Sequence, residues 1–212
     1  MSTAGRTGEP RGSRLLEVVA VALLAVATVG SAWCAYQASQ WNGEQTRLAR
    51  VSSDSRVEAS RLFSLATQTI SYDTNVIGLY AQAVATKNTG LADFYRQVLV
   101  RKDFLPILDR WEADIAKGVV PPGLLDDPDY LNARLAGYNE AIALAEKSSL
   151  ESEEAGQTGD SYILAALVIA VSLFFAGVTP TFKVRGVRIL LLAGSGFTLA
   201  YAASRIADLG VL

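Results

Sequence analysis

The chain has 212 residues, of which 50% are hydrophobic and only 19% are charged, so it is richer in apolar side chains than an ordinary soluble protein. Its net charge of −2, without a basic stripe, argues against nucleic-acid binding, which depends on clustered Lys and Arg. The absence of histidine removes the commonest general base and zinc ligand, and a single cysteine cannot form an internal disulfide. A membrane protein is therefore the first class to consider.

Three apolar stretches divide the chain. The first carries no charge from Val18 to Tyr36, about the ~20 helical residues needed to cross ~30 Å of hydrocarbon. The sequence predicts an all-α integral membrane protein with three transmembrane helices and a helical-bundle extracytoplasmic domain. The expected segments are a cytoplasmic tail (1–14), a first span (15–37), an extracytoplasmic helical domain (38–160), a second span (161–179), a cytoplasmic turn (180–186) and a third span (187–207).

The first apolar stretch also has features of a cleaved signal peptide. Arg11 and Arg14 precede it, and small residues suited to cleavage occur at Gly30-Ser31-Ala32. The apolar run, however, continues past Ala32 into aromatic residues, which favours a span that is retained.

Aromatic residues mark the exit of this span. Trp33, Tyr36 and Trp41 precede the polar run Asn-Gly-Glu-Gln at 42–45. Amphipathic rings concentrate at headgroup depth, so these three residues are predicted to lie at the outer membrane interface. An aromatic cage for a ligand is the alternative interpretation. Cys34 reads as a small packing residue.

Basic residues predict the orientation. They occur before the first span and in the turn between the second and third, where the positive-inside rule places the cytoplasm. The residues concerned are Arg6, Arg11, Arg14, Lys183, Arg185 and Arg188. Two spans separate these sites, so both can face the same side. Segment 38–160, in which acidic residues outnumber basic ones, is then expected outside.

The outer segment is predicted to be almost wholly helical. Apolar residues recur at helical spacing from 38 to 88. A kink or break near 71–74 would divide this stretch into two helices, with Asp73 or Thr74 as the new N-cap, and would give four helices of balanced length. Neither Gly nor Pro occurs at 71–74, so an unbroken helix is the alternative.

Two more helices follow. One is expected over 91–117, kinked or broken by Pro106. The next is expected to begin at Asp127 as N-cap and Pro128 as the first helical residue.

Candidate sites for chemistry are few. Asp126, Asp127 and Asp129 could bind a divalent cation, but acidic residues also complement a helix start, and this structural role is the expected one. Arg205 and Asp208 follow the third span, where they could reach water and pair with each other. No charge lies near the middle of a span, as a proton relay would need. No catalytic, cofactor-binding or metal site is predicted.

Small residues recur at four-residue spacing along two of the spans. They are Ala27, Ser31 and Ala35, continued by Ser39, in the first and Gly196, Ala200 and Ser204 in the third. Such ridges let helices approach closely within a membrane, so they are predicted to pack within one chain or between copies.

Both ends of the chain carry a resemblance. The stretch AWCAYQASQWNGEQ, Tyr162, LFFAG at 173–177, Phe182 and KVRGVR at 183–188 resemble uncharacterised bacterial membrane proteins with one N-terminal span, a helical middle and two C-terminal spans, a domain of unknown function. The resemblance implies this architecture and a bacterial inner (plasma) membrane. It implies no active residues.

Two functional classes are expected. The first is a scaffolding or accessory membrane protein that acts through helix packing, with the lipid bilayer and a second copy or another membrane protein as partners. The alternative is a sensory or transport-associated component whose helical outer domain binds a ligand. An enzyme is not expected, and neither is a cofactor.

Overall fold

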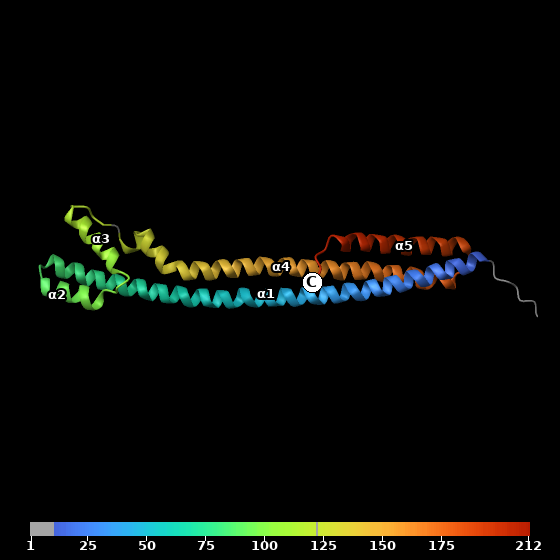
Figure 1. Cartoon of the computed structure of the whole chain (residues 1–212), viewed down its shortest axis with the longest axis horizontal. Helices are drawn as coiled ribbons and strands as arrows, with labels where there is room; N and C mark the ends of the chain where they lie inside the picture. Colours follow the sequence, from blue (N-terminus) through green and yellow to red (C-terminus); the bar gives the residue numbers. More distant parts are fainter. Residues whose placement is uncertain (1–10, 122) are drawn as a thin grey trace, which may run out of the picture. The chain divides into compact units, whose positions relative to one another are not determined.

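The computed structural model describes residues 11–121 and 123–212, and within these ranges every regular element is a helix (Figure 1). The all-α prediction is confirmed. The α-helices are α1 (Arg11–Ala85), α2 (Thr89–Phe94), α3 (Leu105–Ala116), α4 (Pro128–Val178) and α5 (Arg185–Ala207). A π-helical turn (Tyr95–Leu99) and two 3-10 turns (Leu124–Asp126 and Thr179–Thr181) complete the list.

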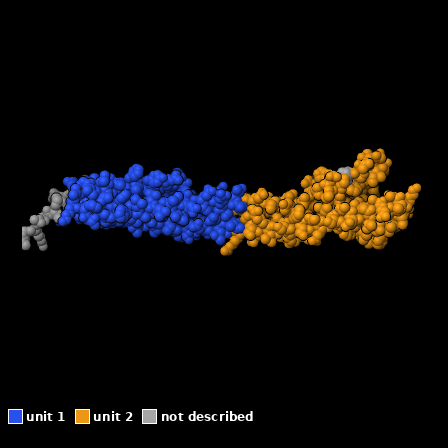
Figure 2. Space-filling model, turned by 180° about the vertical axis from the view of Figure 1, so that it is seen from behind, with its two compact units in different colours: residues 1–49, 149–212 blue, residues 50–148 orange. Residues whose placement is uncertain are grey.

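The chain forms two compact units, which Figure 2 distinguishes by colour. Unit 1 consists of Met1–Ala49 and Ser149–Leu212, and unit 2 of Arg50–Ser148. Both α1 and α4 contribute residues to each unit.

Three helices, α1, α4 and α5, are long and apolar enough to cross a membrane. In their most apolar windows only 11%, 33% and 17% of the residues are buried within the protein, respectively. Most of these apolar side chains therefore face outward, an arrangement that lipid solvates and water does not. The helices indicate a membrane protein.

Within unit 1, α1 and α4 meet along a seam of small residues. Ala27, Cys34 and Ala38 of α1 are almost fully buried and belong to one cluster with Tyr162 and Ile169 of α4. Ala20, Ala27 and Cys34 recur every seven residues, the spacing that keeps one face of a helix against its neighbour in a left-handed coil. Small side chains permit a close approach of the two backbones.

The helix α5 packs on α4 through a polar contact. The hydroxyl of Ser172 donates to the carbonyl of Ser195 at 2.9 Å, and the hydroxyl of Ser195 donates to the carbonyl of Ser172 at 3.0 Å. Both serines are fully buried, and Leu192 and Ala202 of α5 are buried on the same side of the helix. The contact satisfies polar groups that would be costly to leave unpaired among apolar side chains.

Within unit 2, α1 and α4 also meet along a seam that contains small residues. The hydroxyl of Ser52 donates to the carbonyl of Ala145 at 2.8 Å, and the rings of Phe63 and Tyr138 lie 5.3 Å apart. A Cβ added to Gly137 would lie 3.4 Å from Leu62, so this glycine permits the close approach there.

The predicted break at 71–74 is absent, because α1 is a single helix from Arg11 to Ala85, which confirms the alternative of an unbroken helix. Asp73 caps no helix. Its side chain is 2% exposed and forms an ion pair with Arg101. Thr74 donates its hydroxyl to the carbonyl of Ile70 within the same helix. The carboxylate that suggested a cap is instead used in tertiary contacts.

The helix expected over 91–117 is two helices with a π-helical turn at the end of the first. The chain leaves helical geometry between Val100 and Phe104, and Pro106 lies in the first turn of α3. A proline there loses no intrahelical hydrogen bond, so Pro106 begins a helix instead of kinking one.

The predicted cap at Asp127 is confirmed. One carboxylate oxygen of Asp127 accepts the backbone N–H groups of Asp129 and Tyr130, each at 3.1 Å. The helix that starts there continues without interruption into the second apolar stretch, so both belong to α4.

Candidate functional site

Unit 2 contains two almost fully buried carboxylates, Asp127 at the start of α4 and Asp73 within α1. One oxygen of the Asp73 carboxylate is 3.1 Å from Nε of Arg101, and the other accepts the hydroxyl of Tyr130 at 2.8 Å. Arg101 lies between α2 and α3, whereas Tyr130 lies in the first turn of α4. Asp73 therefore joins three parts of the chain that are distant in sequence.

A second acidic residue extends this network. Asp103 accepts hydrogen bonds from Arg101 at 3.0 Å and from Arg134 at 2.7 Å. The guanidinium of Arg134 also lies 5.5 Å from the ring centre of Tyr130. Burial and then the hydrogen bond to Asp73 raise the pKa of Tyr130 well above its usual range, so the phenol stays neutral. The network uses its charges to hold the fold and leaves no unpaired nucleophile or base at Asp73.

An apolar groove lies beside this network, between α1 and α3. Its volume is about 540 Å³. The lining residues are Ile77, Tyr80, Ala81, Val84 and Ala85 of α1, Leu108, Trp111, Glu112, Ile115 and Ala116 of α3, and Pro121. The lining is almost entirely apolar, and its titratable groups are Tyr80 and Glu112.

These two groups are held by neighbouring side chains. The hydroxyl of Tyr80 donates to Glu112, which also pairs with Arg96. Arg96 in turn pairs with Asp109. Burial, then the hydrogen bond to Glu112, raises the pKa of Tyr80. The polar edge of the groove is therefore fixed before anything binds.

Large apolar side chains around the groove remain uncovered. Val84 and Ile115, which line it, are 50% and 60% exposed. A groove lined by exposed apolar side chains is typical of an interaction site. The groove is the part of unit 2 best suited to binding.

The aromatic residues of the first span lie in unit 1 and differ in exposure. Tyr36 is 56% exposed and its hydroxyl accepts a hydrogen bond from Gln40. Trp33 is 39% exposed, with its ring 5.6 Å from that of Tyr162. The indole N–H of Trp41 donates to the carbonyl of Gly210 at 3.0 Å.

The segment after α5 is held against α1 and α4 by several hydrogen bonds. Gly210 accepts, besides Trp41, the hydroxyl of Tyr162 at 3.0 Å. The side-chain amide of Gln37, which is 2% exposed, donates to the carbonyl of Leu212 and accepts its N–H. Trp41 thus helps to hold the segment after α5 against α1.

The small residues predicted to pack lie in different environments. In α1, Ala27 is fully buried, Ser31 is half-buried and Ala35 is exposed. In α5, Gly196 is half-buried, whereas Ala200 and Ser204 are exposed. A Cβ added to Gly196 would meet no atom within 4 Å.

Two of the charged residues considered as a cation site, Asp127 and Asp129, form ion pairs within the protein. Asp127 pairs with Arg110, which also lies 3.3 Å from Asp129. In the described ranges no group of three or more acidic or cysteine side chains is placed to hold a metal ion. The expected pair between Arg205 and Asp208 is absent from the ion pairs of the described residues.

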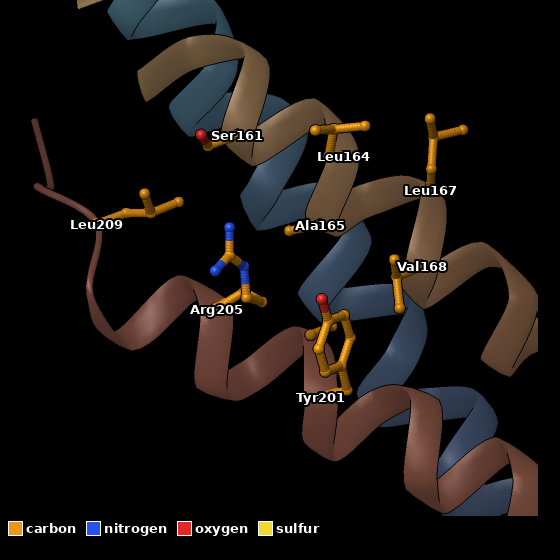
Figure 3. A pocket seen from close by; sticks show the side chains of 9 residues that line it. Ser161, Leu164, Ala165, Leu167, Val168, Tyr201, Arg205 and Leu209 are labelled. Atoms are coloured by element: carbon orange, nitrogen blue, oxygen red, sulfur yellow. The ribbon is translucent and has the colours of Figure 1, made fainter. Parts of the chain in front are cut away.

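A second cavity, of about 280 Å³, lies in unit 1 between α4 and α5 (Figure 3). Its polar side chains are Ser161, Tyr201 and Arg205, and the remainder of its lining is apolar. Arg205 was a candidate from the sequence, but its position beside Tyr201 and α4 follows only from the packing of α5 on α4.

No protein-family model, curated protein or solved structure matches the chain. The class is therefore defined by the fold alone: an all-helical protein with three helices able to span a membrane.

Some site residues gave little sequence signal. Arg101 begins the charged run Arg-Lys-Asp at 101–103, Arg134 lies between two apolar residues of α4, and nothing local links either of them to Asp73. Gln37 gave no signal either, because a polar residue at the exit of a span is expected to face water, and only the structure shows it buried against Leu212.

Proposed function

We propose that the chain is an integral protein of a bacterial plasma membrane that acts as a scaffolding or accessory subunit. The three apolar helices support membrane insertion, and the sequence resemblance supports the bacterial location. Residues 38–160 would lie outside the cytoplasm, because the basic residues flank the other ends of the spans. The proposal assigns no reaction to the chain and requires no cofactor.

The observation that carries the binding role is the groove between α1 and α3. Its partner would be an amphipathic helix of another protein, placing its apolar side chains against Ile77, Val84 and Ile115. Grooves of this kind bind helices through apolar anchors at helical spacing. The pairing of Arg96 with Asp109 and Glu112 fixes α3 beside the π-helical turn, so one wall of the groove is held in place without a partner.

A small apolar ligand is the second candidate for this groove. Its volume of about 540 Å³ lies within the ~300–1,000 Å³ typical of small-molecule sites. The carboxylate of Glu112 on the wall would orient such a ligand. A ligand bound in this groove would correspond to a sensory or transport-associated role.

Site-specific photocrosslinking in native membranes tests the role of the groove. A photoreactive residue at Ala81, in the groove lining, should yield one discrete protein adduct. The same residue at exposed Glu140 on α4 serves as the control and should not. If Ala81 gives no protein adduct and the purified chain retains a small molecule that Ala81→Trp expels, the groove binds a ligand and the scaffolding hypothesis is wrong. If neither occurs, the groove is not the binding site.

Thiol labelling in intact cells tests the topology. In a Cys34→Ala background, Ser149→Cys should react with an impermeant reagent and Gly186→Cys should not. The opposite labelling would reverse the proposed orientation. Intact-mass measurement tests retention of the first span, since loss of the first ~32 residues would show cleavage of a signal peptide.

A further inference from the structure

The cavity between α4 and α5 combines an apolar surface with a charged edge. Ser161, Leu164 and Leu167 line it from α4, and Tyr201 and Arg205 line it from α5. Figure 3 shows the guanidinium of Arg205 extending from α5 towards α4, near Ala165, with the hydroxyl of Tyr201 directed to the same space. Leu164 and Leu167 are 61% and 59% exposed, so this apolar wall is not covered by the protein.

Among the described residues, the guanidinium of Arg205 and the hydroxyl of Tyr201 have no protein acceptor. Arg205 takes part in no ion pair among the described residues, and no hydrogen bond involves the hydroxyl of Tyr201 there. The nearest acids in sequence, Asp160 and Asp208, are exposed and do not lie within ion-pair distance of Arg205. Ser161 already donates its hydroxyl to the carbonyl of Gln157 at 2.8 Å, so its oxygen can only accept further hydrogen bonds. The site therefore presents a guanidinium and a phenol to an acceptor from outside the chain.

The position of the cavity specifies the acceptor further. The lining residues of α4 begin the second apolar stretch, and those of α5 end the third. If these helices cross a bilayer, the cavity lies at one membrane boundary, with the apolar wall towards the hydrocarbon. At such a boundary the exposed guanidinium of Arg205 is available to an anion of the headgroup region.

We infer that this cavity binds an anionic phospholipid of the surrounding leaflet. Arg205 and Tyr201 would donate to the phosphodiester oxygens, since guanidinium and phosphate are geometrically matched. Leu164, Leu167 and Val168 would contact the upper part of one acyl chain. A free phosphate would leave this apolar wall uncovered, so the lipid accounts for more of the site. The inference rests on the proposed membrane insertion.

Native mass spectrometry of the full chain in mild detergent tests the inference. Phosphatidylglycerol and phosphatidylcholine are titrated separately, and wild type should retain one phosphatidylglycerol in preference to phosphatidylcholine. Arg205→Gln should weaken this binding about tenfold or more, and Tyr201→Phe should weaken it by a smaller factor, because hydrogen bonds to a charged group exceed neutral ones. Arg185→Gln is the matched control, since it removes an exposed arginine at the opposite end of α5.

The apolar half of the site is tested separately. Leu164→Gln should also weaken phosphatidylglycerol binding, whereas inorganic phosphate should not compete with the lipid. Competition by phosphate together with an unaffected Leu164→Gln variant would show an anion site without lipid specificity. Equal retention of the two lipids, or an Arg205→Gln variant that binds like wild type, would overturn the inference. Because Arg205 is exposed and without an ion pair, its variant should keep the wild-type helical content, which circular dichroism verifies.

Failure of this inference is distinguishable from failure of the proposed function. A chain that alkaline carbonate removes from membranes would not be an integral protein, and both would fall. A chain that stays in the membrane and forms the Ala81 adduct but shows no lipid preference would contradict the lipid site alone.

Discussion

Substitution of Asp73 distinguishes the ion pair of unit 2 from the helix cap that the sequence suggested. In the structure the carboxylate, 2% exposed, meets Arg101 at 3.1 Å and Tyr130 at 2.8 Å. We expect Asp73→Asn and Asp73→Ser to destabilise unit 2, because each leaves Arg101 without its buried counter-charge. In a cap, both replacements would be nearly equivalent to aspartate.

The magnitude follows from the burial of the two partners. Removing one member of a buried pair costs about 3–5 kcal/mol. The side chain of Arg101 is 31% exposed and keeps a contact with Asp103 at 3.0 Å, so part of its charge remains solvated and paired. The hydrogen bond from Tyr130 to a charged acceptor contributes about 1.5–3 kcal/mol. We expect a loss of about 3 kcal/mol for Asp73→Asn, against about 1 kcal/mol for loss of an N-cap on Asp73→Ala.

Chemical unfolding of the full chain in mild detergent measures this loss. Trp111 reports on unit 2 when Trp33 and Trp41 of unit 1 are replaced by phenylalanine, and that background is the reference for every variant. Thr74→Ser is a matched control, since it keeps the hydroxyl that donates to Ile70. If Asp73→Asn and Asp73→Ser unfold like the reference while Asp73→Ala loses about 1 kcal/mol, the residue acts as a cap and the ion-pair reasoning is refuted.

Three further predictions follow from individual contacts. Ser172→Ala and Ser195→Ala should each cost about 0.6 kcal/mol and show positive coupling in a double-mutant cycle measured by SDS titration; additive losses would mean that the two hydroxyls act independently. Because the folded-state pKa of Tyr130 is raised, its contribution to the free energy of unfolding is fully present below pH ~10 and is lost at higher pH, where the unfolded phenol ionises first. In thermal melts at alkaline pH, the melting temperature of a Tyr130→Phe variant should therefore fall less steeply with pH than that of wild type. An unchanged dependence on pH would contradict this. A Cβ at Gly210 would lie 3.1 Å from the ring of Trp41, so Gly210→Val should displace the segment and shift the tryptophan emission to the red, whereas Gly177→Val, at a glycine with open space around it, should not.

The sequence determined those features that depend on local chemistry. Runs of apolar residues of spanning length determine which helices are long and apolar enough to cross a membrane. The pair Asp127-Pro128 fixed the start of α4, because the carboxylate satisfies N–H groups only two and three residues away. Such interactions are complete within a few residues and need no tertiary information.

The seam between α1 and α4 was less visible because its buried residues are small. Ala59, Ser52 and Ser55 of α1 are buried at three- and four-residue spacing, yet they carry little hydrophobic signal. The apolar repeat of 38–88 includes Leu48 and Ala66, which are buried, although Phe63, also in the repeat, is 50% exposed. Periodicity therefore predicted the helix and most of its buried face, but not the exposure of Phe63 or the burial of Ser52 and Ser55.

Only the tertiary structure decided that α1 continues through 71–74. Asp73 can cap a new helix or remain inside one, and both conformations satisfy the local rules. The choice depends on Arg101 and Tyr130, which approach Asp73 only after α3 and α4 have folded back. The groove and the cavity at Arg205 arise in the same way. The side chains that line each of them come mainly from two helices. The chemistry of each site therefore depends on how closely those two helices pack, which no single stretch of sequence specifies.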